Sequence, residues 1–308
     1  MNIIYLTHDK IDKKKWDRCI ENASNGLIYA FSFYLDIMSA GWDALVMDDY
    51  EAVMPLTWNK KFGIAYLYQP AFTQQGGIFG ADIYANKLVD AFIAKAIDKF
   101  PFIEINLNYA NQFDSATSIK CNSILHLNKS FPELERAFRK DLVKIVNSND
   151  ELLYSTSEDI ATAIDLFKEN YSDRIYTPKK SYENLLKLYT LLKKQDQLFI
   201  RKVRGPEQEV LALAIFLRDS KRIYYVMSAT AKDGRKSNAN YFLLYHVIKE
   251  FSGQNLIFDF EGSAVSSINF FFKKFGAIEQ SYPFVRINRL PLWKRWIKDK
   301  YDHYKGRS

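Results

Sequence analysis

Residues 198–229 read LFIRKVRGPEQEVLALAIFLRDSKRIYYVMSA. This stretch holds three short apolar runs that are rich in β-branched or aromatic residues, as β-strands are: 198–203, 210–217 and 223–227. Turn-forming residues separate the runs, with Gly205-Pro206 after the first and Asp219-Ser220-Lys221 after the second. The stretch therefore predicts a meander of three strands.

A helix and a fourth strand follow this meander. A stripe of apolar residues at helical spacing predicts a helix over 238–251; its members are Tyr241, Leu244, Tyr245 and Ile248. The apolar run 256–260 then predicts a strand. Because a crossover helix lets the strands on either side of it run parallel, we expect a mixed sheet with a helix covering it.

The first half of the chain shows the same order of elements. Its predicted elements are strands at 44–47, 52–58, 64–68 and 103–107, with a helix at 85–100 before the last strand. Two helices precede each meander, at 10–21 and 32–40 and again at 158–170 and 181–193. Ser155 and Glu158 stand at capping-box spacing ahead of the helix 158–170. We interpret this order as a structural duplication with little residue identity.

The duplication predicts an α/β fold of two tandem domains, each with a mixed central sheet flanked by helices. Asn147-Ser148-Asn149-Asp150 interrupts the apolar pattern, so we place the boundary there. The expected organisation is an N-terminal domain over 1–150, a C-terminal domain over 151–290, and a basic, aromatic tail over 291–308.

Composition indicates a globular protein of the cytoplasm. Of the 308 residues 48% are hydrophobic, and no apolar run approaches the roughly 18 residues that a membrane span needs. The start of the chain lacks the apolar core of a signal peptide. Two Cys and four scattered His exclude a disulfide framework and predict no metal site.

The excess positive charge gathers at the end of the chain. Residues 286–308 hold eight Lys or Arg against two Asp, which accounts for +6 of the formal net charge of +7. Trp293 and Trp296 lie among these charges. The segment either binds RNA or anionic lipid, or forms a terminal helix whose Trp residues pack on the body of the protein.

Helix–helix–meander–helix–strand resembles the GNAT acyltransferase fold, and a tandem pair of such units resembles the FemAB-like, methicillin-resistance-like family. The segments that carry the resemblance are Ile223–Ala229, Tyr241–Tyr245, Asp259–Ser263 and Phe271–Ala277. In the first half, Trp42, Met54-Pro55-Leu56 and the loop 69–77 fit a looser family pattern. The family includes aminoacyl-tRNA-dependent peptidoglycan ligases, so the resemblance implies transfer of an acyl or aminoacyl group to an amine.

Such chemistry needs a group that takes the amine proton, and Asp259 and Glu261 are the candidates. The resemblance places them where two parallel strands splay apart, at the ends of 223–229 and 256–261. Strand alternation puts both carboxylates on one face, with Phe260 on the other. Either carboxylate is a candidate base or a ligand for a cationic acceptor; alternatively, each only caps the following helix.

The donor loop of GNAT enzymes resembles Arg235–Asn240 here, although Asn238 and Asn240 replace two glycines of the family pattern. Asn accepts a left-handed backbone, but its side chain obstructs the close approach of a pyrophosphate. The replacement favours aminoacyl-tRNA over acyl-CoA as cosubstrate and leaves both open. The expected donor-binding residues are Ser228, Arg235, Lys236, Ser237, Asn238, Asn240 and Phe272.

Phe272-Lys273 resembles a Phe-Lys pair that lines the channel to the ester in aminoacyl-tRNA-using relatives. By that resemblance, Lys273 would stabilise the oxyanion or contact the 3′-terminal phosphates. Alternatively, Phe272 belongs to a buried stripe and Lys273 faces water. In the first half, the loop 69–77 occupies the place of the donor loop, so we expect an acceptor site there: Tyr68, Gln69, Gln74 and Gln75.

The sequence thus predicts a transferase without a tightly bound cofactor. Its acceptor is a peptidoglycan precursor or a small amine, and its donor is acyl-CoA or aminoacyl-tRNA. Two alternatives remain open. The first is a non-catalytic GNAT-fold binding module with a degenerate donor site. The second is an RNA-binding protein, which rests on the basic tail alone.

Overall fold

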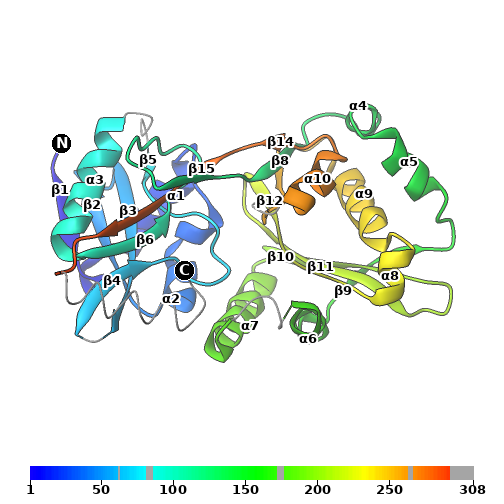
Figure 1. Cartoon of the computed structure of the whole chain (residues 1–308), viewed down its shortest axis with the longest axis horizontal. Coiled ribbons are helices and arrows are strands. Elements are labelled where there is room, and N and C mark those ends of the chain that lie inside the picture. Colours follow the sequence, from blue (N-terminus) through cyan, green and yellow to red (C-terminus); the bar gives the residue numbers. More distant parts are fainter. Residues whose placement is uncertain (62, 81–85, 172–176, 263–265, 292–308) are drawn as a thin grey trace. The chain divides into compact units, whose positions relative to one another are not determined.

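The computed structural model describes residues 1–61, 63–80, 86–171, 177–262 and 266–291. The chain divides into two compact units (Figure 1). The first unit is Met1–Lys120 together with the described residues from Tyr282 onward, and the second unit is Cys121–Ser281. No helix within the described ranges has the length and apolar content needed to cross a membrane.

The first unit contains an eight-stranded mixed sheet with the strand order β1-β2-β3-β4-β6-β15-β7, and β5 pairs with β3. Its strands are β1 Ile3–Leu6, β2 Trp42–Met47, β3 Ala52–Lys61, β4 Ile64–Tyr68, β5 Phe79–Gly80, β6 Phe102–Asn106, β7 Ser118–Lys120 and β15 Tyr282–Asn288. Its helices are the short η1 His8–Lys10 and η2 Ile28–Ala30, with α1 Lys13–Asn22, α2 Ser32–Met38 and α3 Asn86–Lys99.

Two layers of helices cover this sheet. The apolar stripe of α3, which includes Val89, Phe92 and Ala96, packs with Leu45 and Ile103 in one core. Because neighbouring residues of a strand point to opposite faces, Trp42 of β2 lies on the other face, where it packs against Trp16 of α1 with a ring-centroid distance of 5.1 Å.

The second unit contains a seven-stranded mixed sheet with the order β14-β8-β13-β12-β11-β10-β9. Its strands are β8 Ser123–His126, β9 Leu153–Ser157, β10 Leu198–Arg204, β11 Val210–Arg218, β12 Arg222–Thr230, β13 Ile257–Asp259 and β14 Ile278–Glu279. Its helices are α4 Phe131–Arg136, α5 Lys140–Asn147, α6 Ile160–Tyr171, α7 Lys179–Lys194, α8 Lys232–Lys236, α9 Ala239–Phe251 and α10 Ser266–Lys273.

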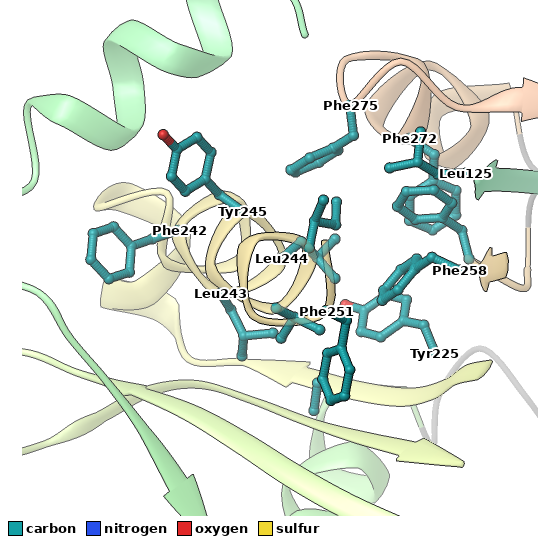
Figure 2. Close-up of a cluster of buried hydrophobic side chains, with 14 of the residues drawn as sticks. Leu125, Tyr225, Phe242, Leu243, Leu244, Tyr245, Phe251, Phe258, Phe272 and Phe275 are labelled. Carbon is teal, nitrogen blue, oxygen red and sulfur yellow. The ribbon is translucent and has the colours of Figure 1, made fainter. Parts of the chain in front are cut away.

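The helix α9 lies at the centre of the second unit's main core. Eight of its 13 residues are buried, so it is apolar around most of its circumference rather than along one stripe. Figure 2 shows Phe258, Phe272 and Phe275 together on one side of this helix, and they belong to the same core. The helices α6 and α7 contact β10, β11 and β12, and α9 also contacts β11. Because helices thus cover both faces of β11, its sequence is a continuous apolar run.

The predicted duplication is confirmed. In each unit three antiparallel strands lead through a covering helix to a strand that pairs in parallel with the third: β4 with β6, and β12 with β13. An antiparallel strand from elsewhere in the chain then pairs with that fourth strand, β15 with β6 and β8 with β13. The α/β class with mixed sheets and two tandem GNAT-like units follows from this topology.

The division into units differs from the expected boundary near residue 150. The segment 121–150 belongs to the second unit, because β8 pairs with β13 and the residues Leu134, Phe138 and Leu142 pack in its core. In exchange, β15 from the end of the chain completes the first sheet by pairing with β6. The expected tail over 291–308 lies outside the described residues except for Pro291.

Candidate functional site

The two parallel strands β12 and β13 of the second unit pair over three residues and then diverge. β12 pairs with β13 from Arg222↔Ile257 to Tyr224↔Asp259, and β12 then continues to Thr230 along β11 alone. We call the region beyond Tyr224 and Asp259 the splay. A β-bulge lies at its start, since the register with β11 shifts between Tyr225 and Met227. Because a bulge bends and twists its strand, it accounts for the divergence of β12 from β13.

Aromatic side chains pack around the start of the splay. The ring of Tyr225 stacks on Phe216 at 5.4 Å and meets Phe272 edge-on at 6.2 Å, while Phe260 packs against Phe272 at 4.7 Å. Phe272 is 4% exposed. The predicted donor-binding residue Phe272 therefore lies in the core that Figure 2 shows, as the alternative interpretation of the sequence proposed.

Asp259, the first candidate base, is buried at the base of the splay. Its carboxylate forms an ion pair with Arg222 at 2.9 Å, and the two side chains are 1% and 2% exposed. It also accepts hydrogen bonds from Asn122 Nδ2 at 2.8 Å and from the amide of Glu261 at 3.1 Å. Arg222 Nη1 donates further to Gln280 Oε1 at 3.0 Å. Asp259 thus joins separate segments of the second unit.

Glu261, the second candidate base, lies beyond the end of β13. Its φ is 54° and that of Gly262 is 58°, so the chain makes a left-handed turn at both residues. The strand alternation that would place Glu261 on the same face as Asp259 therefore stops at Asp259. Glu261 is partly exposed, which distinguishes it from the buried Asp259.

The predicted donor loop connects β12 to α9 through the short helix α8. Asn238 has φ 56° and ψ 32°, the left-handed conformation that its amino-acid type tolerates, and α9 begins at the next residue. The side chain of Asn240 accepts a hydrogen bond from the Tyr225 hydroxyl at 3.0 Å, so it is held against the sheet. Within the described part of the chain, the amides of Ala239 and Asn240 have no hydrogen-bond acceptor.

The cationic residues of this loop are engaged locally. Arg235 Nη1 donates to Thr230 O at 2.9 Å and to Asn170 Oδ1 at 3.0 Å, which fixes the loop to β12 and α6. Lys236 forms an exposed ion pair with Asp233. The hydroxyl of Ser237 donates to backbone oxygens of α8.

Two further predicted residues occupy the strand and helix on either side of the splay. Ser228 lies in β12 opposite Ala214, past the last pair with β13. Lys273 is the last residue of α10 and is exposed, whereas its neighbour Lys274 forms an ion pair with Asp141 at 2.9 Å.

The expected acceptor residues of the first unit follow the equivalent parallel pair. β4 and β6 pair only at Leu67↔Ile103 and Tyr68↔Glu104, so Tyr68 stands where Tyr224 stands in the second unit. Gln69 accepts a hydrogen bond from the Asn106 amide at 2.9 Å. Tyr68 is partly exposed, and its hydroxyl accepts a hydrogen bond from the amide of Ala40.

The loop 69–77 is held by side-chain amides. The Asn106 side chain donates to Gln74 O at 2.7 Å, and Gln75, which is fully buried, accepts from the Tyr109 amide at 2.9 Å. Gln69 and Gln75 line a cavity of about 20 Å³, which suffices for about one water molecule. These two glutamines shape the loop, while Tyr68 and Gln74 retain partial exposure.

A second polar cluster lies against the edge strand β9, where Tyr154, Arg201, His246 and Glu250 line a depression of about 450 Å³. Tyr154 and Arg201 both donate hydrogen bonds to Glu250. Burial raises the pKa of Glu250, but these hydrogen bonds outweigh it and hold that pKa below its usual range. Burial lowers the pKa of His246, and the charge of Lys249 adds to this.

Sequence reasoning missed Arg222 and Asn122, which contact the predicted Asp259, and Lys120, which contacts Asn106 beside the loop 69–77. A cation at the start of an apolar strand, as in Lys221-Arg222-Ile223, is a weak signal, because such residues are usually exposed. Lys120 lies near Asn106 only because β15, from the other end of the chain, lies between β7 and β6. No local pattern predicts that placement.

Comparison with known proteins identifies the class to which this geometry belongs. A model of the acetyltransferase (GNAT) domain matches residues 136–266. That range contains β12, α9, β13 and the splay. No curated protein sequence matches the chain.

Solved structures resemble the whole chain. FemX covers 94% of it, with 98% of FemX covered, at 13% identity and a TM-score of 0.63. The C-terminal domain of a putative lysylphosphatidylglycerol synthetase from Agrobacterium fabrum matches 90% of this chain and is itself covered to 92%. The identity is 11% and the TM-score 0.54. A conserved protein of unknown function from Bacteroides thetaiotaomicron matches 90% of this chain and is itself covered to 97%. The identity is 10% and the TM-score 0.55. The chain therefore has the fold of FemX over nearly its whole length, and its residues 136–266 match the GNAT domain model.

Proposed function

We propose that the protein is a FemAB-like transferase that moves an acyl or aminoacyl group from acyl-CoA or aminoacyl-tRNA to an amine. The acceptor is a peptidoglycan precursor or another small amine. The observation that carries the proposal is the splay between β12 and β13. It adjoins a loop with a left-handed Asn238 and two helix-end amides that have no acceptor among the described residues. Amides at a helix start favour the phosphates of a donor.

The reaction is direct attack of the amine on the donor carbonyl carbon. A new C–N bond forms, and the C–S bond of a thioester or the C–O bond of an ester breaks. We assign the amine proton to Glu261, because Asp259 is buried and already paired with Arg222. The departing thiolate or 3′-oxygen takes up a proton, and Lys273 is the proposed cation near the developing charge.

Binding of the donor is tested by titration calorimetry with acetyl-CoA. The informative variant is Ser237→Asp, because it puts a negative charge two residues before Ala239, the first residue of α9, where that charge opposes an anionic donor. The matched control is Ser220→Asp, which puts the same charge on the exposed turn between β11 and β12. We expect wild type and control to bind alike and Ser237→Asp to bind about tenfold more weakly.

Transfer is tested with labelled donors and a panel of amines. Glu261→Gln should lower the rate by about 10²–10⁴-fold, the usual contribution of a general base, while Glu279→Gln on the edge strand β14 should not. If acetyl-CoA does not bind, labelled aminoacyl-tRNA replaces it as donor. Absence of transfer from both donors would refute the proposal.

A non-catalytic binding module is the second candidate. It is favoured by the commitment of Asp259 to a buried ion pair and of Phe272 to the core, since neither side chain then faces a substrate. This candidate predicts that acceptor analogues bind and that Glu261→Gln leaves binding unchanged, with no turnover from either donor.

A further inference from the structure

The face of the first sheet that α3 does not cover carries an unusual lysine. Ile103, Ile105 and Val285 point into the core beneath α3, so their neighbours Glu104, Asn106 and Phe284 lie on the opposite face. Lys120 of β7 belongs to the same face, because it pairs with Tyr282, two residues before Phe284. Its side chain crosses the ring of Phe284 with Nζ 4.3 Å from the centroid.

The ammonium group of Lys120 reaches the end of β6. Its Nζ donates to Asn106 Oδ1 at 3.0 Å, and Asn106 in turn donates to Gln74 O in the loop 69–77. This position is equivalent to that of Glu261 in the second unit, since Asn106 lies two residues after the last pair of β4 with β6. Lys120 is thus directed at the splayed end of the first sheet.

Lys120 has a hydrogen-bond partner and an aromatic partner, but no carboxylate of the described residues lies within ion-pair distance of it. Among the described residues it forms no ion pair, and it is half-buried. The nearby carboxylate, Glu104, lies 3.8 Å from Arg286 Nε. Burial lowers the pKa of Lys120, and the charge of Glu104 opposes this shift. An ammonium ion has three donors, and removing it from water without an anion is unfavourable.

We infer that Lys120 is the counter-charge for an anionic group, a carboxylate or a phosphate, of a ligand bound at the splayed end of the first sheet. Tyr66, Tyr68 and Phe284 are partly exposed on this face and supply apolar surface beside the charge. The identification of this ligand with the amine acceptor rests on the proposed function, whereas the anion site itself does not.

Calorimetric titration of the full chain with sodium pyrophosphate and with glutarate, at matched ionic strength, tests the inference and distinguishes the two chemistries. The variants are Lys120→Met, which keeps the length of the side chain, and Lys120→Arg, which keeps the charge. Lys95→Met on the exposed side of α3 is the control. At least one anion should bind the wild type. The affinity for that anion should fall about tenfold or more in Lys120→Met. In Lys120→Arg and in Lys95→Met it should stay within about threefold of the wild-type affinity.

Thermal unfolding without ligand separates this role from a structural one. If Lys120 is held for a ligand, Lys120→Met should unfold at the same temperature as the wild type or higher, because it removes a half-buried charge that forms no ion pair with the described residues. The inference is overturned if neither anion binds the wild type or if Lys120→Met binds as well as it does. A lower unfolding temperature with unchanged anion affinity also overturns it. None of these readouts requires transfer, so failure of the proposed function is seen separately.

Discussion

Removal of Arg222 should destabilise the second unit by about 3–5 kcal/mol, the range measured when one partner of a buried ion pair is lost. The substitution is Arg222→Met, which keeps much of the side-chain volume. It leaves the carboxylate of Asp259, which is 1% exposed, without its cation. The same substitution also removes the hydrogen bond that Arg222 donates to Gln280 Oε1.

The partners that remain set the magnitude. Asp259 keeps its hydrogen bonds from Asn122 Nδ2 and from the Glu261 amide, which still stabilise a negative charge. The lost bond to the guanidinium contributes about 1.5–3 kcal/mol as a bond between charged groups. The remainder is the cost of an uncompensated buried charge. We therefore expect a value near the lower end of the range.

A double variant checks this reasoning. Arg222→Met combined with Asp259→Asn removes both charges and preserves Oδ1 as acceptor for Asn122 and for the amide of Glu261. It should be destabilised by less than either single variant, because neither partner then leaves a charge behind.

Hydrogen exchange of peptides from β12 and β13 measures the stability of the second unit, to which both strands belong. The described Trp residues (Trp16, Trp42 and Trp58) all belong to the first unit, so none of these three reports on the second unit by its fluorescence. A loss of about 3 kcal/mol corresponds to exchange roughly 100-fold faster. The control is Arg201→Met, whose partner Glu250 is 33% exposed; we expect about 1 kcal/mol there. An effect of Arg222→Met no larger than this control, or a double variant less stable than both singles, would refute the reasoning.

Three further predictions concern the second unit. Gly234→Ala should lower stability by about 1–3 kcal/mol in chemical denaturation, because a Cβ at that position would lie 2.0 Å from Leu211 O. Glu250→Gln should be less stable than wild type above pH 4.5, and the difference should vanish in acid melts as the pH falls through the lowered pKa of Glu250. Phe272→Ala should cost about 3–5 kcal/mol in the same denaturation assay, and Lys273→Ala next to it should change stability little.

The order of helices and strands is predictable from local patterns. Helix α9 and the strands β10, β11 and β12 coincide with their predicted ranges to within a few residues, because their apolar spacing is long and regular. Short strands carry no such signal. β14 has two residues and β5 has two, and neither was predicted.

One local signal was misleading. Ser155 and Glu158 match the capping-box spacing, yet Ser155 belongs to β9, where it pairs with Lys202. The helix α6 is instead capped by Asp159, which accepts a hydrogen bond from the Thr162 amide at 2.9 Å. The strand forms because pairing with β10 supplies hydrogen bonds for the backbone groups of a whole segment, whereas a helix cap supplies them for only one or two groups.

In the candidate site too, some features follow from local sequence and others depend on residues distant in the chain. The sequence placed Asp259 and Glu261 at a strand end, and it marked Asn238 and Asn240 as two residues that accept a left-handed backbone, which only Asn238 adopts at the start of α9. It gave no means of separating the two carboxylates. Their difference arises because Arg222, 37 residues away, and Asn122, 137 residues away, converge on Asp259 alone.

The sequence by itself determined that this chain consists of two similar α/β units and where the helix-to-strand order repeats, because hydrophobic periodicity acts over a few residues. Only the tertiary structure decided which segment completes each sheet, which carboxylate is buried with a cation, and that Lys120 lies beside Asn106 across β15. These features depend on burial and on partners distant in sequence, and they exist only once the strands have paired.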